Sequence, residues 1–286
     1  MNLTERRLAF REVLEGDRVV HPGSVYDPIS ARIAEDLGFE VGMFAGSIAS
    51  ATVLGAPDYI VLTMTEFAQQ AHRICRAGTL PLLVDADHGY GNALNVKRTV
   101  EELETAGVSA LTIEDTSLPR GFGVRGQTLI SLDEGVGKMK AALEGRQDPS
   151  LVVAGRTGAL AIESPRETIR RIQAYERAGV DAIFLVGLET KEQLEMVSAE
   201  ITIPILMGGG KAGLADLEYL AAHGVRVALQ GHQPFMAAVK AAHDTLKALR
   251  EGTLPTDLRD RIASDGLIAE VTRRGSYDCW TKEFLT

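Results

Sequence analysis

Five polar residues directly follow short apolar runs in this 286-residue sequence, and their types suggest chemistry on a charged substrate. Asp85 and Asp87 follow the run PLLV, Glu114 follows ALTI, Arg156 follows LVVAG and His232 follows VALQG. Alternate residues of an extended strand point to the same side, so Asp85 and Asp87 are expected to share a face. Taken singly, each residue has an ordinary explanation as a solvated loop residue, a helix cap or a structural hydrogen-bonding group. Their occurrence after four different apolar runs favours one shared site.

The residue types in this set indicate a metal ion and an oxyanion. Carboxylates that cluster without Cys or His ligands suit a hard divalent cation such as Mg2+ or Mn2+. Mg2+ usually takes one or two carboxylates and keeps several waters, which leaves positions for substrate oxygens. Arg156 could bind a carboxylate through two parallel hydrogen bonds, and Gly46 and Ser47 could offer backbone N–H groups to an anion. These residues predict a metal-dependent enzyme acting on a small oxyanionic substrate.

A repeated structural unit is needed to bring these residues together, and the chain has one. A short apolar run, a turn and an amphipathic charged stretch recur along the sequence. Strands that alternate with helices indicate parallel pairing, and near-continuous apolar runs indicate strands buried on both faces. Eight such units over about 250 residues predict an α/β fold, a (β/α)8 TIM barrel, whose active sites lie at the carboxyl ends of the strands. Strands are expected around residues 19–20, 40–46, 81–87, 110–116, 151–157, 182–187, 204–209 and 226–232, and helices at 28–37, 66–77, 96–106, 134–144, 166–178, 192–199, 215–223 and 235–249.

Capping signals mark the boundaries of these helices. Capping-box patterns, in which Ser or Thr is followed three residues later by Glu or Gln, begin at Thr63, Ser131, Ser164 and Thr190. Glycines that suit the left-handed position after a helix are Gly38, Gly78, Gly107, Gly179 and Gly224.

A doubly wound open sheet is the alternative fold. The Gly-x-Gly-x-x-Gly turn expected after the first strand of a dinucleotide-binding sheet is missing, which disfavours it. No linker divides the sequence, so we interpret residues 1–286 as a single barrel domain, with residues 252–286 as a C-terminal helical appendage. The appendage carries Tyr277, Trp280 and Phe284, and we expect it to cap the barrel or to contact another subunit.

The composition restricts the partners and the location. The 30 Lys and Arg residues against 39 Asp and Glu residues give a formal net charge of -9, and no basic block indicates nucleic-acid binding. No apolar stretch approaches the roughly 18 residues of a membrane helix, and the first residues lack the apolar core of a secretory signal. Cys75 and Cys279 are too few for a disulfide framework and too far apart for a metal motif. We therefore expect a cytoplasmic protein with no nucleic-acid or membrane partner.

Several motifs resemble those of the isocitrate lyase/phosphoenolpyruvate mutase superfamily. They are DADHGYGN at 85–92, TIEDT at 112–116, FAGSIAS at 44–50, GAPD at 55–58 and GRT at 155–157. The resemblance extends over nearly the whole chain, from residues 24–39 to residues 230–246. Within the superfamily, DADHGYGNALNV, EDTSLP and the late GH are most similar to the bacterial oxaloacetate decarboxylases. The resemblance implies a homotetramer, a dimer of dimers whose subunits exchange their last helix.

The resemblance also implies how the acids hold Mg2+, or alternatively Mn2+. Asp85 would be the direct ligand. Asp87 and Glu114 would hold the ion through its waters, with Asp58 as a further acid nearby.

The implied reaction is decarboxylation of oxaloacetate, a 2-oxo acid, to pyruvate and CO2 through a metal-bound enolate. Gly46 and Ser47 would bind substrate oxygens, Arg156 would hold a substrate carboxylate, and His232 would contact the substrate from the last strand. Arg156 and His232 are therefore the catalytic candidates in this lyase reaction. The metal would act as a Lewis acid, and the C–C cleavage needs no general base.

The stretch PRGFG at 119–123 separates this chain from the C–C lyases of the superfamily. Those lyases resemble one another in a Lys/Arg-Cys-Gly-His loop whose Cys is the acid–base residue. Phe122 lies where that Cys would fall and cannot shuttle a proton, so 2-methylisocitrate lyase activity is not expected. The segment GFGVRG also lacks the polar residues expected in the gating loop of the mutases and phosphonopyruvate hydrolases.

Two positions depart from the resemblance and leave the exact substrate open. The run Gly208, Gly209, Gly210 and Lys211 could be a backbone anion site, although a turn with a surface Lys is favoured. Gly158 lies where a side-chain amide or acid is more usual, which leaves the pocket more open. The alternatives are another reaction on a 2-oxo acid or phosphonate (oxaloacetate hydrolase, 2-methylisocitrate lyase-like or phosphonopyruvate-cleaving), or non-catalytic binding of a small oxyanion, since barrels host many functions.

Overall fold

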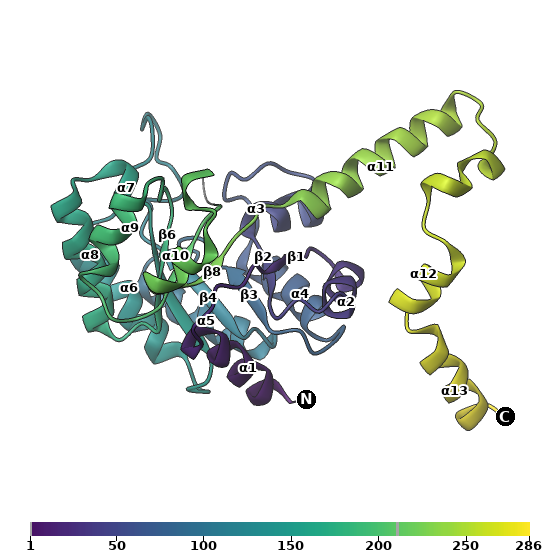
Figure 1. The fold of residues 1–286 in the computed structure, drawn as a ribbon, viewed down its shortest axis with the longest axis horizontal. Coiled ribbons are helices and arrows are strands. Elements are labelled where there is room, and N and C mark those ends of the chain that lie inside the picture. The colour runs from purple at the N-terminus through teal and green to yellow at the C-terminus, as the bar shows by residue number, and fades with distance from the viewer. Residues whose placement is uncertain (1, 210–211) are drawn as a thin grey trace. The chain divides into compact units, whose positions relative to one another are not determined.

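The structure is a computed structural model that describes residues 2–209 and 212–286. The chain divides into two compact units, one that ends at Gly231 and one that begins at His232 (Figure 1). The first unit contains every strand of the described chain, and the second is helical. The interpretation of the whole chain as one domain with an appendage from residue 252 stays a prediction.

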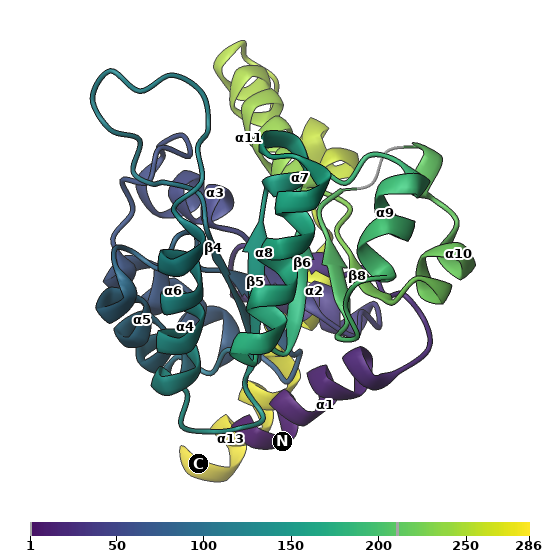
Figure 2. The same ribbon diagram turned by 90° about the vertical axis from the view of Figure 1, so that its left-hand side faces the viewer.

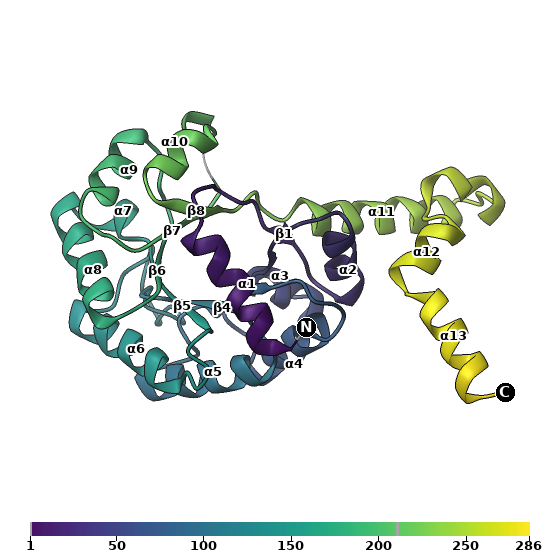
Figure 3. The same ribbon diagram turned by 60° about the horizontal axis from the view of Figure 1, so that its bottom comes forward.

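The first unit is an eight-stranded parallel sheet whose strands follow one another in sequence order. A parallel bridge between Val20 and Val227 joins the two ends of the sheet, with the Val20 N–H donating to Arg226 O at 2.9 Å. Helices surround the strands (Figure 3), which confirms the predicted TIM-barrel class. The strands are β1 (Gly23–Ser24), β2 (Gly42–Phe44), β3 (Leu82–Asp85), β4 (Ala110–Glu114), β5 (Val152–Thr157), β6 (Ala182–Leu185), β7 (Ile205–Met207) and β8 (Val225–Ala228).

The first strand is later than expected. The sequence prediction centred it on residues 19–20, whereas β1 covers Gly23–Ser24 and only the single bridge lies at Val20. Pro22 explains the difference, because it has no N–H to donate to a ladder. Regular pairing begins beyond it, where the Gly23 N–H donates to Val41 O at 2.9 Å.

The eight expected helices of the two units are present, and no end is shifted by more than three residues. Three helices were not expected: α1 (Leu3–Glu15), α3 (Gly46–Ala49) and α7 (Ala159–Ile162). A π-helical turn, Ser50–Leu54, follows α3 directly. The expected helices are α2 (Pro28–Asp36), α4 (Met64–Cys75), α5 (Ala93–Thr105), α6 (Leu132–Gly145), α8 (Pro165–Ala178), α9 (Lys191–Ser198), α10 (Leu217–Ala222) and α11 (Gln233–Arg250).

The predicted N-terminal caps form, two of them completely. Thr63 and Thr190 make full capping boxes, in which the side chain three residues later bonds back to the cap. Ser131 and Ser164 accept the backbone N–H of the residue three positions later. The sequence therefore located the starts of four helices correctly.

The predicted left-handed glycines are confirmed at four of five positions, with φ of 82° at Gly38, 94° at Gly107, 100° at Gly179 and 78° at Gly224. The prediction for Gly78 is wrong, because its φ is not positive. A β-carbon there would collide with the Glu35 carboxylate, so close packing explains this glycine.

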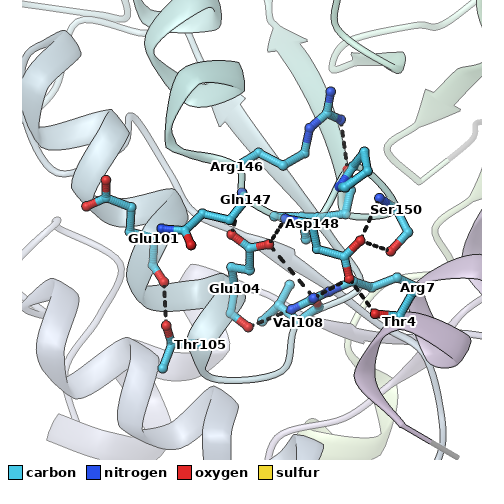
Figure 4. Close-up of polar contacts among 12 residues, drawn as sticks. Thr4, Arg7, Glu101, Glu104, Thr105, Val108, Arg146, Gln147, Asp148 and Ser150 are labelled. Atoms are coloured by element: carbon cyan, nitrogen blue, oxygen red, sulfur yellow. Dashed lines mark hydrogen bonds and ion pairs between the residues drawn. The ribbon is translucent and has the colours of Figure 1, made fainter.

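Helix α1 crosses the amino-terminal end of the barrel, the end shown in Figure 3. Its Arg7 is buried and donates to Glu104 O at 2.6 Å, to Val108 O at 3.1 Å and to Asp148 Oδ2 at 2.7 Å (Figure 4). Asp148 Oδ2 also accepts the Thr4 hydroxyl at 2.8 Å. Because TIM-barrel chemistry lies at the opposite end, these contacts serve stability.

The second unit consists of α11, a 3-10 segment at Pro255–Arg261, α12 (Asp265–Val271) and α13 (Arg274–Phe284). No residue of α11 or α13 is buried. Tyr277 and Trp280 pack edge to face with ring centroids 5.2 Å apart. Within the described chain, no helix combines the length and the apolar character needed to cross a membrane.

Candidate active site

The carboxyl ends of β3, β4 and β5 bring Asp85, Glu114 and Arg156 together. The strand register pairs Glu114 with Arg156 and Asp85 with Thr112. The Arg156 guanidinium forms an ion pair with Asp85 and lies 3.4 Å from Glu114 Oε2. It also lies over the Phe184 ring of β6, 5.5 Å from the centroid. Acids and a cation from three adjacent strands thus share one end of the barrel.

Asp87 joins this group through the loop that follows β3. Its φ of 47° is left-handed, and its N–H donates to Asp85 Oδ1 at 3.2 Å. The Glu114 N–H donates to Asp87 O at 2.8 Å, which ties the loop to β4. Gly46, at the start of α3, packs against the Asp87 carboxylate so closely that a β-carbon would lie 2.6 Å from Oδ1.

Electrostatics show that the acids repel one another. Burial, and then the charges of Asp85, Glu114 and Asp58, raise the pKa of Asp87 to about 9. Burial also raises the pKa of Glu114 to about 7, although Arg156 opposes the shift. The pKa of Asp58 is raised by burial and by Asp85, which places Asp58 within electrostatic reach of the cluster. One guanidinium therefore faces four carboxylates, and the excess negative charge suits a cation.

These residues fit Mg2+ or a similar hard cation. All the donors are carboxylate oxygens, and the repulsion that raises their pKa values would be relieved by a divalent ion. Within residues 2–209 and 212–286, no three Asp, Glu, His or Cys side chains are gathered as a ready-made metal-binding group. Mg2+ does not require such a group, since it commonly takes one or two carboxylates and completes its shell with water.

Asp115 and Arg171 support this end of the barrel, although the sequence motifs suggested no role for either residue. Asp115 Oδ2 accepts the Tyr175 hydroxyl at 2.8 Å and Arg171 Nη1 at 3.3 Å, and Asp115 is fully buried. Arg171 also donates to Ile130 O at 3.3 Å, at the end of the loop that follows β4. A signal was present, because the buried face of α8 repeats at residues 168, 171, 172 and 175 and so includes this arginine.

The loop after β3 holds two further polar residues, the buried His88 and the half-buried Tyr90. Among the described residues, His88 Nδ1 and the Tyr90 hydroxyl have no hydrogen-bond partner. Their ring centroids are 6.1 Å apart. Burial, with a contribution from Lys138, lowers the pKa of His88 to about 4, so its ring is neutral near pH 7.

The remaining sequence candidates lie at other positions. Ser47 is half-buried in α3, directly after Gly46, and Gly158 precedes α7. Phe122 is completely exposed in the loop of residues 117–131 that projects from the barrel (Figure 2). His232 is the first residue of the second unit, and its contact with substrate stays a prediction.

The glycine-rich run after β7 is only partly described. Gly209 lines a cavity of about 600 Å3 beside β7, β8 and α10. Gly210 and Lys211 lie outside the described residues, so the anion site suggested for this run stays untested.

The parallel barrel, with a cluster of acids and one arginine at the carboxyl ends of β3 to β5, defines the class of protein: a TIM-barrel enzyme with an acidic site. Within that class, the chain belongs to the phosphoenolpyruvate phosphomutase family, whose model matches residues 10–250. The resemblance noted in the sequence is therefore confirmed.

Relatives of known name and structure agree with this assignment. An oxaloacetate decarboxylase of Bradyrhizobium diazoefficiens is 59% identical over 273 residues, which are 96% of this chain and 94% of that protein. A phosphoenolpyruvate phosphomutase of Streptomyces platensis subsp. rosaceus superposes with a TM-score of 0.87 at 27% identity, covering 98% of this chain and 99% of that one. A phosphonopyruvate hydrolase in complex with oxalate and Mg2+ gives a TM-score of 0.85 at 27% identity, with the same coverage of 98% and 99%.

Proposed function

We propose that this protein is a Mg2+-dependent oxaloacetate decarboxylase that releases pyruvate and CO2. The observation that carries the proposal is the group of buried carboxylates around Arg156 at the carboxyl end of the barrel. The relative with 59% identity bears the name of this activity. A structurally similar hydrolase holds oxalate with Mg2+, and oxalate resembles the 2-oxo carboxylate end of oxaloacetate in its two adjacent oxygen-bearing carbons.

The acids would hold the cation in two ways, directly and through its bound waters. We assign Asp85 as the direct ligand, and Asp87, Glu114 and Asp58 as acceptors of hydrogen bonds from its waters. Mn2+ is a second candidate for the same oxygen ligands. When bound, the ion supplies Lewis acidity that stabilises the negative charge developing on the 2-oxo oxygen as CO2 leaves.

The chain's own groups would bind and orient the substrate. Arg156 would hold a substrate carboxylate and provide a fixed positive charge near the reacting atoms. The backbone N–H groups of Gly46 and Ser47 would bind substrate oxygens, and His232 would contact the substrate. The bond to CO2 breaks without a general base, and the resulting enolate takes its proton from water. Phe122 is exposed and offers no proton, which agrees with a decarboxylase rather than a C–C lyase with an acid–base thiol.

The assay measures both oxaloacetate loss and pyruvate formation, with Mg2+ or with EDTA. Because free Mg2+ decarboxylates oxaloacetate slowly, the matched control is the Asp85→Ala protein under identical conditions. Pyruvate formation above that background, abolished by EDTA, supports the proposal. Loss of oxaloacetate without pyruvate would instead indicate hydrolysis to oxalate and acetate, and no loss would reject oxaloacetate as the substrate.

We further propose that the protein is a cytoplasmic homotetramer, a dimer of dimers, that exchanges α11 between subunits. Several large apolar residues of α11 are exposed, among them Met236, Val239 and Leu246. The first unit ends shortly after β8 and has a cavity of about 600 Å3, with polar and apolar lining residues, beside β7, β8 and α10. Sedimentation equilibrium of the full chain tests this assembly, and a monomer at micromolar concentration would reject it.

A further inference from the structure

Lys138 is a buried cation on the outer side of the barrel, next to the loop that carries two of the acids. It lies on α6, which packs against β4 and β5 (Figure 2). The residue is only 3% exposed, and its Nζ donates to the His88 carbonyl oxygen at 2.8 Å. Lysines are almost never buried unless they are paired, so this position calls for an explanation.

Burying this ammonium is unfavourable, and its bonding partner is neutral. Burial lowers the pKa of Lys138, although the charges of Glu134, Glu114 and Asp115 partly oppose the shift. A methionine of similar length would fill the same space without the penalty of burying a charge. The benefit of a lysine must therefore come from the hydrogen bond that its ammonium makes.

That hydrogen bond holds a loop whose backbone is left-handed at several positions. The φ angles are 47° at Asp87, 77° at Gly89 and 60° at Tyr90. Left-handed conformations of residues other than glycine are unfavourable and persist only when the surroundings impose them. The surroundings here must therefore fix the loop from outside it.

Each of four consecutive carbonyl groups in this loop has its own donor. Only one of those donors is a charged side chain, and it is Lys138. The bonds are Gly89 N–H to Ala86 O (2.9 Å), Glu114 N–H to Asp87 O (2.8 Å), Lys138 Nζ to His88 O (2.8 Å) and Thr99 Oγ1 to Gly89 O (3.1 Å).

We propose that Lys138 is a positioning residue for the acid cluster: by fixing the His88 carbonyl it holds Asp87 in the orientation that binds the hydrated Mg2+. The inference rests on the proposed function, since it assumes a metal at this cluster. Lys138 touches neither substrate nor metal in this account and acts through the loop.

The test is Mg2+ affinity, measured by isothermal titration calorimetry in the absence of substrate. Lys138→Met removes the donor and leaves the His88 carbonyl unpaired. We expect Mg2+ to bind roughly 10- to 100-fold more weakly, as is typical when a residue that supports metal-binding groups is lost. The matched control is Lys140→Met, two residues further along α6 and exposed, which should bind Mg2+ like the wild type.

The direction of the change in Mg2+ affinity separates a positioning role from a purely electrostatic effect and from a role in folding alone. Removing a positive charge near Glu114 would, by electrostatics alone, make Mg2+ bind more tightly. A role in folding alone would lower the melting temperature and leave the Mg2+ Kd unchanged. Tighter or unchanged binding by Lys138→Met therefore overturns the inference.

Should Lys138→Met fail to fold, Lys138→Gln is titrated instead: its neutral amide reaches one bond less far, so a smaller loss in the same direction is expected, and no loss overturns the inference. If the wild-type protein binds no Mg2+, the proposed metal site fails and this inference fails with it. If the wild type binds Mg2+ and Lys138→Met binds it equally well, only the inference fails.

Discussion

Gly46→Ala is the smallest change that should disable the acid cluster, because it adds one methyl group against Asp87. A β-carbon at this position would lie 2.6 Å from Oδ1 and 2.8 Å from Oδ2 of Asp87. Ordinary van der Waals contact begins at 3.4 Å, so the carboxylate has to move by about 0.8 Å.

The size of the effect follows from that movement. A misplacement of about 1 Å near reacting groups costs roughly 100-fold in rate, so we expect kcat/KM for oxaloacetate to fall roughly 10- to 100-fold. Stability should be preserved, because φ at Gly46 is not positive and Ala favours a helix more than Gly does. The loss would then come from the site and not from unfolding.

The assay combines pyruvate formation with the thermal shift that Mg2+ produces in the absence of substrate. The second measurement separates displacement of Asp87 from a direct clash between the new methyl group and the substrate, since only displacement reduces the Mg2+ shift. Gly137→Ala is the control, because a β-carbon there meets nothing within 4 Å. A Gly46→Ala protein that keeps the full Mg2+ shift and a kcat/KM within about threefold of the wild type would refute this reasoning.

Three more predictions concern charge. Arg156→Lys should lower kcat/KM roughly 100-fold, because an ammonium cannot replace the two-pronged guanidinium that faces Asp85 and Glu114; steady-state kinetics that show an unchanged kcat/KM would argue against a substrate-binding role. Burial and the neighbouring acids raise the pKa of Asp87 to about 9, so the folded protein holds this proton more tightly than the unfolded chain does. The stability that this difference contributes is lost as pH rises from about 4 toward about 9. Metal-free protein should therefore lose melting temperature over that range, and the stabilisation by Mg2+ should grow from pH 6 to pH 8.5 in a scanning fluorimetry series; a shift that shrinks with pH would contradict this. For Asp148, burial acts to raise the pKa, but hydrogen bonds from Ser150, Arg7 and Thr4 hold it well below its usual range, so its contribution is present at neutral pH and is lost as pH falls below about 4. Asp148→Asn should lower the free energy of unfolding by roughly 1 to 3 kcal/mol at pH 7 and by a smaller amount at pH 3, where the contribution is only partly lost, which urea denaturation at both pH values measures.

The sequence predicted the barrel and the grouping of Asp85, Glu114 and Arg156, because both depend on local patterns. The eight apolar runs are short and near-continuous, and Asp85, Glu114 and Arg156 follow their runs at the carboxyl ends of the strands. Asp85, Glu114 and Arg156 therefore meet as soon as β3, β4 and β5 pair in order. No long-range information beyond the strand order was needed to group them.

The features that were missed depend on tertiary contacts. Helix α1 shows charged residues among apolar ones, and its burial is evident only once Arg7 reaches the carbonyl groups at the bottom of the barrel. Lys138 and Arg171 lie on the inner faces of their helices, where a charged residue is unexpected until its buried partners, His88 O and Asp115, are in place. The delayed start of β1 was a local signal that was overlooked, since Pro22 interrupts the apolar run.

In the proposed function, Asp85 binds the cation on which decarboxylation depends. The most direct test is the initial rate of pyruvate formation from oxaloacetate as a function of Mg2+ concentration, in the wild type and in Asp85→Asn. Asp133→Asn, an exposed acid in the first turn of α6, is the matched control. We expect saturable Mg2+ activation in the wild type and in the control, and only the background rate of free Mg2+ in Asp85→Asn. Saturable activation of Asp85→Asn with the wild-type Mg2+ dependence would show that Asp85 is not the metal ligand.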